Sequence, residues 1–245
     1  IIIFIIPFLI SVNKTYAIEL PKPLASDDFH EVDMKQVKIG RLLFHDKILS
    51  ANRNIACATC HSHDQGGSDG LSLGIGEGGQ GIGLERTAGE GDDKIKKRIP
   101  RNALALWNLG FKDITTLLHD GRVTKSNIFG NGFNTPAQEA LPKGLDNIVA
   151  VQALFPMTRQ FEMAGNPGEN EIIGLVSKVG KDSMRIDRVW PVITYRIRGI
   201  PEYVELFKNA FDDVNSPLDI NITHIVNSIA CLLYTSPSPR DQLQS

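Results

Sequence analysis

The side chains best suited to chemistry lie in one five-residue segment, Cys57-Ala58-Thr59-Cys60-His61. Two thiols one helical turn apart can reach the two vinyl groups of one haem and form thioethers, and the adjacent imidazole can then ligate the iron. We therefore predict a covalently attached haem c, bound through Cys57 and Cys60, with His61 as the ligand of the haem iron.

A zinc site and a redox-active cysteine pair are the competing interpretations of this segment. His63 could act as a fourth zinc ligand, but a zinc ribbon normally has a second cysteine pair, and the chain has three cysteines in all. A thioredoxin-like pair would need a βαβ setting, which the helical pattern of this sequence does not provide. We assign no role to the remaining cysteine, Cys231.

The beginning of the chain has the character of an export signal. Residues 1–12 are almost wholly apolar, and Thr15-Tyr16-Ala17 offers a site for signal peptidase. A membrane anchor would need about 20 apolar residues, whereas this run ends at Asn13. We predict a signal peptide over residues 1–17, truncated at its start, and a periplasmic protein without a stable membrane span after cleavage.

Overall composition places few limits on function. The chain has 245 residues, of which 42% are hydrophobic, and a formal charge of -2 without long runs of one sign. This length is sufficient for a packed core. The charge gives no reason to expect nucleic acid as a partner.

Apolar spacing is helical wherever it is clear, namely over residues 39–43, 203–211 and 222–229. Pro201 and Pro217 each suit a first helical turn, the latter behind Ser216 as a cap. No run of alternating residues predicts a strand. The fold class that follows is all-α, a cytochrome c-like haem domain with long loops.

A long glycine-rich loop follows the cysteine and histidine segment. Residues 66–91 hold eleven of the 22 glycines. Gly74, Gly76 and Gly79 have the spacing of a dinucleotide-binding loop, but no strand precedes them and no helix follows. We therefore expect a functional or disordered loop and no nucleotide.

Further short motifs follow one another in the order of a known family. They are Ile39-Gly-Arg-Leu-Leu-Phe-His-Asp46, Leu49-Ser50, the haem-attachment segment, Pro100-Arg-Asn-Ala103, Asp120-Gly-Arg122, and Gln152 with Pro156 and Glu162-Met163. Over residues 37–230 the chain thereby resembles the bacterial di-haem cytochrome c peroxidases, which include the tryptophan-modifying enzyme of methylamine metabolism.

The resemblance implies an amino-terminal haem domain that reduces hydrogen peroxide, followed in the family by a second haem domain. By motif match, Glu162 would be the distal acid/base, Gln152 its hydrogen-bonding neighbour, and Asn102 a ligand of calcium between the two domains. Without the family, Glu162 would be a solvated loop residue. Gln152 would be a helix-surface residue, and Asn102 a turn or cap residue.

The sequence departs from the family pattern in two places. Residues 64–118 contain neither His nor Met, so the usual distal histidine of the glycine-rich loop is absent. His119 stands before Asp120, where the family often has a tryptophan between the haems. We count His119 among the catalytic candidates, as a ligand or as part of an altered electron route, with an ordinary hydrogen-bonded histidine as the equal alternative.

The tail changes character at about Cys231, where a helical pattern gives way to the polar, proline-punctuated segment from Tyr234 to Asp241. We predict a haem domain over residues 18–230, leading into a second haem domain that is missing. The tail, over residues 231–245, is predicted to be non-native or disordered.

The function predicted from these observations is a periplasmic haem peroxidase domain. It would receive electrons from a small cytochrome c or copper protein through a second haem, and a homodimer is a further expectation. One alternative is a plain electron-transfer cytochrome, with Met157, Met163 or His119 as second axial ligand. The other is oxidation of a protein or organic partner.

Overall fold

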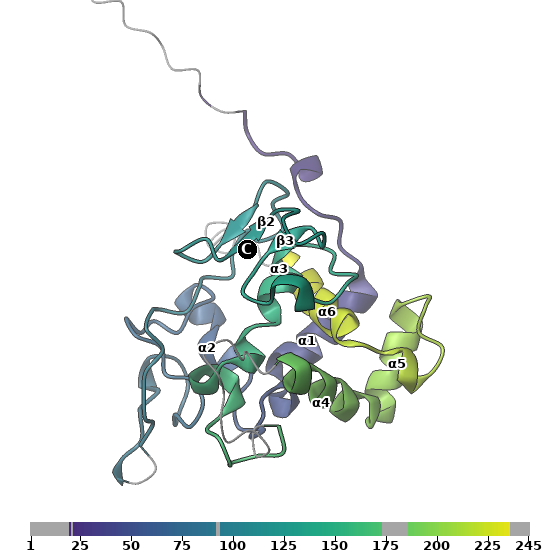
Figure 1. Cartoon of the computed structure of the whole chain (residues 1–245). Helices are drawn as coiled ribbons and strands as arrows, with labels where there is room; N and C mark the ends of the chain where they lie inside the picture. The colour runs from purple at the N-terminus through teal and green to yellow at the C-terminus, as the bar shows by residue number, and fades with distance from the viewer. Residues whose placement is uncertain (1–19, 21, 92–93, 173–185, 236–245) are drawn as a thin grey trace, which may run out of the picture.

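The computed structural model describes residue 20 and residues 22–91, 94–172 and 186–235 (Figure 1). The predicted signal peptide and residues 236–245 of the predicted tail lie outside these ranges. The chain is mostly helical, which confirms the predicted class. Figure 1 shows α1 and α6 near the centre, α4 and α5 on one side of them, and α2 with the glycine-rich loop on the other.

The core is built on the pairing of α1 (Met34–His45) with α6 (Ile222–Tyr234). Asp33 starts α1, because its Oδ1 accepts hydrogen bonds from the amides of Lys35 and Gln36 at 2.7 and 3.4 Å. The two helices meet at Gly40, where an added Cβ would lie 2.0 Å from the carbonyl oxygen of Ser228. Glycine is therefore required for this close approach.

The other helices are α2 (Cys57–Cys60), α3 (Ile148–Ala153), α4 (Ile186–Arg198) and α5 (Pro201–Ala210). Pro201 occupies the first turn of α5, as predicted. Pro217 also occupies a first helical turn behind Ser216, but this is a separate 3₁₀ turn, Pro217–Asp219, and not the start of α6. α6 starts later, after Asn221, whose Oδ1 accepts the amide of Thr223 at 2.9 Å.

Single turns of other helix types connect these elements. The 3₁₀ turns are Ser26–Asp28, Lys47–Leu49, His63–Gln65, Gly83–Glu85, Gln138–Ala140, Pro156–Thr158 and Pro217–Asp219. A π-helix spans Gln160–Ala164. Such π-helical turns are rare and occur often at functional sites.

A small antiparallel sheet, which the sequence did not predict, covers one end of the molecule (Figure 1). Its strands are β1 (Thr116–Leu117), β2 (Val123–Lys125) and β3 (Phe133–Asn134), in the order β1-β2-β3. Thr116 pairs with Thr124, and Thr124 pairs in turn with Asn134. Strands of two or three residues are too short to produce an alternating pattern, so periodicity could not reveal them.

Helix α4 holds the loop that leads to the haem-attachment segment. The buried guanidinium of Arg196 donates hydrogen bonds to the carbonyl oxygens of Ile48, Ser50 and Ala51 at 3.1, 2.7 and 2.8 Å. The amide of Ala51 donates to the carbonyl of Met163 at 2.9 Å. The loop that precedes α2 is therefore hydrogen-bonded both to α4 and to the π-helix.

Helix α6 continues past the point where the sequence changes character. Cys231 is buried, and the ring of Tyr234 stacks on His30 with ring centroids 5.0 Å apart. Tyr234 also lies against Gly110, where an added Cβ would be 3.3 Å from its Cβ. Residues 231–234 are thus packed against the domain.

No helix in residues 22–91, 94–172 and 186–235 combines the length and the apolar character needed to cross a membrane.

Candidate haem site

The two cysteines of the attachment segment lie one turn apart on α2. The amide of His61 donates to the carbonyl of Cys57 at 3.0 Å, and the amide of Ala56 donates to Oγ1 of Thr59 at 3.0 Å, so both ends of this short helix are hydrogen-bonded. Burial raises the pKa of Cys57 to about 12 and that of Cys60 to about 11. Such thiols are protonated near neutral pH, which disfavours a redox-active thiolate pair.

His61 is oriented by a hydrogen bond to the glycine-rich loop. Its Nδ1 lies 2.8 Å from the carbonyl oxygen of Gly67. We assign the proton to Nδ1, because a carbonyl can only accept, and this leaves the lone pair of Nε2 for a metal. Burial lowers the pKa of His61, which favours the neutral imidazole that ligates iron.

Gly67 meets a steric requirement at this point of the loop. It has a φ of +72°, and an added Cβ would lie 2.7 Å from the backbone nitrogen of Leu106. Any larger residue would push the loop away from the segment around Leu106. The hydrogen bond that orients His61 therefore depends on glycine here.

Two adjoining cavities receive these side chains. The first is almost wholly apolar, has a volume of about 70 Å³ and is lined by Cys57 and Gln152 among others. The second has a volume of about 200 Å³ and is lined by His61 and Trp107 among others. Their shared walls are Phe44, Leu106 and Leu233.

Gln152 offers a further sign that the first cavity receives a ligand. Its Oε1 is buried and has no hydrogen-bond partner among the described residues. Leaving a buried polar atom unpaired costs about 1–3 kcal/mol. An apolar cavity lined by Cys57, an oriented imidazole in the adjoining cavity and one unpaired amide oxygen suit haem c, which would be held by thioethers at Cys57 and Cys60 and by His61 at the iron.

Glu162 lies in the π-helix on the side of Cys60. Burial raises its pKa to about 7, against smaller opposing effects of Arg159 and Arg122. The carboxylate is close enough to Cys60 to help raise the pKa of that thiol. A carboxyl with this pKa can both accept and donate a proton near neutral pH.

The glycine-rich loop packs directly on the backbone of Glu162. The amide of Glu77 donates to the carbonyl of Glu162 at 2.9 Å. An added Cβ at Gly76 would lie 2.0 Å from the carbonyl oxygen of Phe161. Gly76 is therefore required for the close packing of the glycine-rich loop on the backbone of Phe161 and Glu162.

Arg86 holds residues 75–81 of the glycine-rich loop by hydrogen bonds, and it was not among the predicted site residues. Its buried guanidinium donates to the carbonyl oxygens of Ile75, Gly76 and Gly81, each at 2.6 Å. Burial lowers its pKa from the usual value. Nothing in the local sequence distinguishes this arginine from an exposed one.

His119 and Asn102 line neither cavity, and the same is true of Cys60 and Glu162. His119 is exposed in the turn between β1 and β2. Asn102 is held within the loop, since its Nδ2 donates to the carbonyl of Leu71 at 2.6 Å and its Oδ1 accepts from Oγ of Ser68 at 2.8 Å. The catalytic role of His119 and the calcium at Asn102 stay predictions.

The arginine of the Asp120-Gly-Arg122 motif approaches the site more closely than the motif's neighbour His119. Arg122 pairs with Asp120, with Nη2 and Oδ2 2.7 Å apart, and its charge acts on the pKa of Glu162. The motif therefore contributes a cation that acts on the Glu162 carboxyl. Sequence reasoning treated it only as a family landmark.

Comparisons with known proteins identify the family of this chain. The family model "Di-haem cytochrome c peroxidase" matches residues 34–244. The methylamine utilization protein MauG of Methylorubrum extorquens is 25% identical over 196 residues, which make up 80% of this chain and 36% of that protein. The cytochrome c peroxidase Ccp of Escherichia coli K12 is 47% identical over 47 residues, or 19% of this chain and 10% of that protein.

A solved structure shows the same fold. It belongs to a MauG-like protein associated with microbial copper homeostasis and superposes with a TM-score of 0.52 at 20% identity, covering 94% of this chain and 51% of that one. The chain thus spans about half of that structure and about a third of the MauG relative.

Proposed function

The chain belongs to the di-haem cytochrome c peroxidase family, and we propose that it is the peroxide-reducing haem domain of such a protein. The observation that carries this proposal is the position of Glu162, a carboxyl with a pKa of about 7, beside the haem-attachment cysteine Cys60. When bound, the haem would supply an iron that binds peroxide and exchanges electrons.

The protein's own groups manage the protons of this reaction. As a carboxylate, Glu162 takes a proton from the peroxide, and as an acid it returns one to the departing oxygen. Gln152 presents an unpaired amide oxygen to the apolar cavity and would orient the bound molecule. The overall change is one hydrogen peroxide, two electrons and two protons giving two waters.

The electron donor, the second haem and the calcium are proposed from membership of the family. Electrons would arrive from a small cytochrome c or copper protein through a second haem outside this chain. Calcium at Asn102 and a role for His119 in the electron route belong with that second domain. Export to the periplasm would follow from the apolar segment over residues 1–17.

One observation favours an electron-transfer cytochrome instead. Met157 and Met163 are both buried and both line the apolar cavity. Either thioether sulfur could serve as a second axial ligand and close the iron to peroxide. The spectrum of the ferric protein separates the two functions, because an open iron is high-spin and a closed one is low-spin.

The direct test is rapid mixing of the ferric protein with peroxide. The chain would be matured in a host with periplasmic haem attachment, and the Soret band would be followed by stopped flow. We expect a change within seconds and without prior reduction, since residues 64–118 offer no His or Met to block the iron. An unchanged band with a low-spin spectrum would support the electron carrier.

A further inference from the structure

The outer face of α1 forms one wall of a shallow groove rich in basic side chains. Lys38, Arg41 and His45 are exposed along α1, and Lys47 follows just after its end. Leu42 lies in the same groove and is 45% exposed. The surface therefore combines several cationic groups with an apolar contact point, as protein-binding surfaces do.

The positive charge of this groove is not neutralised by the domain. Lys38, Arg41 and Lys47 have no carboxylate within ion-pairing distance in the described part of the chain. Asp46 also lines the groove, where its Oδ2 accepts the hydroxyl of Tyr203 at 2.8 Å, but Lys38, Arg41 and Lys47 outnumber this one carboxylate. A partner with carboxylates on its surface would complement this charge.

A short series of rings connects the groove to the iron ligand. The ring of His45 lies 5.5 Å from that of Phe44, which in turn lies 6.5 Å from that of His61, measured between centroids. Arg41 and His45 line both the groove and the cavity that contains His61. A protein docked in the groove would stand close to the imidazole that holds the haem.

We propose that this groove is the docking surface of a small electron-transfer protein with an acidic surface. In each encounter the metal centre of the partner loses one electron and the haem gains it, so two encounters supply the two electrons consumed per peroxide. This inference rests on the proposed function for its haem. It adds a point where electrons enter this domain directly.

Charge reversal within the groove tests the docking. The haem-loaded ferric chain is titrated calorimetrically with oxidised plastocyanin, an acidic copper protein, at low ionic strength. The double variant Lys38→Glu, Lys47→Glu should raise the dissociation constant by about tenfold or more, and added salt should weaken wild-type binding. Neither residue lines the two cavities of the haem site.

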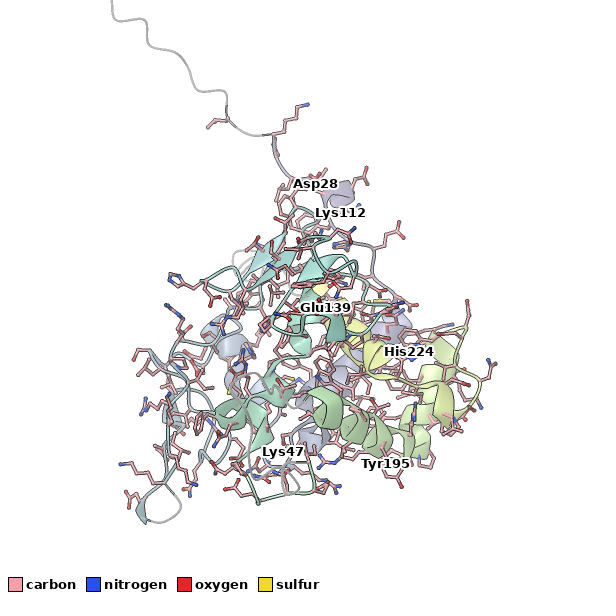
Figure 2. All side chains as sticks on the ribbon, in the orientation of Figure 1. Asp28, Lys47, Lys112, Glu139, Tyr195 and His224 are labelled. Carbon is pink, nitrogen blue, oxygen red and sulfur yellow. The ribbon has the colours of Figure 1, made fainter. Side chains whose placement is uncertain are left out.

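The matched control carries the same change of charge elsewhere. It combines Lys112→Glu with Lys143→Glu, both at exposed lysines outside the groove. Figure 2 shows Lys112 at the opposite end of the molecule from Lys47. We expect the control to keep the dissociation constant within about threefold of wild type when both are compared at about 0.1 M salt, where charges more than about 10 Å apart are largely screened.

Electron transfer gives an independent readout. The ferrous chain is mixed anaerobically with oxidised plastocyanin, and the loss of the blue copper absorbance is followed. The rate should fall by about tenfold in the groove variant and little in the control. This measurement uses no peroxide and is therefore independent of the peroxide test. A chain that binds plastocyanin but does not react with peroxide would overturn the proposed function and leave the docking proposal intact.

Three results would overturn the docking proposal. The first is equal affinity of the groove variant and the control for plastocyanin. The second is tighter wild-type binding of a basic cytochrome c than of plastocyanin. The third is a dimer, detected by light scattering, that the groove variant breaks while its affinity for plastocyanin is unchanged, which would assign the groove to a second copy of the chain.

Discussion

Replacing Glu162 by glutamine tests the proposed proton chemistry at its centre. Glutamine keeps the volume of the side chain but can neither take nor return a proton. Loss of a positioned acid/base lowers rates by about 10²–10⁴. We expect Glu162→Gln to lower the rate constant for reaction of the ferric protein with peroxide by about a hundredfold or more, with unchanged haem content.

The pH dependence supplies a second signature of the same residue. Because burial raises the pKa of Glu162 to about 7, the carboxylate that acts as base forms only as the pH rises through this value. The wild-type rate should therefore increase with pH, reaching about one tenth of its limit at pH 6. Glu162→Gln should lack this increase.

The stability of the folded protein should change with pH in the direction opposite to the peroxide rate. The folded pKa of about 7 exceeds the ordinary value of 4.5, so the folded state binds this proton more strongly than the unfolded state. The contribution of Glu162 to stability is thus present at low pH and is lost as the pH rises to about 7. At pH 8, Glu162→Gln should be more stable than wild type by up to about 3 kcal/mol.

Stopped-flow absorbance of the Soret band measures the rate, and denaturant unfolding measures the stability. Glu139→Gln is the matched control, since Glu139 is exposed (Figure 2) and should leave both quantities at wild-type values. The reasoning is refuted if Glu162→Gln reacts with peroxide at the wild-type rate and with the wild-type pH profile.

Three further substitutions test the surrounding contacts. Gln152→Ala should lower the peroxide rate less than loss of the carboxyl does, and should not destabilise the fold, because its Oε1 has no partner to lose. Gly76→Ala should destabilise by about 1–3 kcal/mol through its contact with the π-helix backbone, whereas Gly199→Ala, with 3.4 Å of clearance, should cost little in denaturant unfolding. Arg196→Met should lower the free energy of unfolding by about 3 kcal/mol by leaving three carbonyls unpaired, and Arg53→Met, at an exposed ion pair, by less than about 1 kcal/mol.

Local patterns were sufficient to propose the haem-attachment segment and to predict three of the longer helices, whereas α3 and α4 were not predicted. The spacing of Cys57 and Cys60 sets their geometry within one turn, whatever the rest of the chain does. The helices α1, α5 and α6 follow from apolar periodicity. Leu42 shows the limit of this method, because its spacing predicts a buried residue and the structure leaves it 45% exposed in the groove.

Contacts between distant segments could not be predicted. Arg86 and Arg196 are buried cations that donate to backbone carbonyls, Arg196 pairing with Glu171 as well. Every residue has a carbonyl, so the sequence cannot indicate which ones are the partners. The same is true of Gly67, whose carbonyl orients His61. The approach of Arg122 to Glu162 depends on a hairpin too short to have a pattern.

The most direct test of the account is the mass of the peptide that carries the attachment segment. Trypsin cuts after Arg53 and Arg86, which releases residues 54–86 with both cysteines. In protein matured with periplasmic haem attachment, we expect this peptide to gain the mass of one haem, bound to both Cys57 and Cys60. A peptide of unmodified mass, from protein that instead contains zinc in equal ratio, would contradict the haem site and the peroxide chemistry built on it.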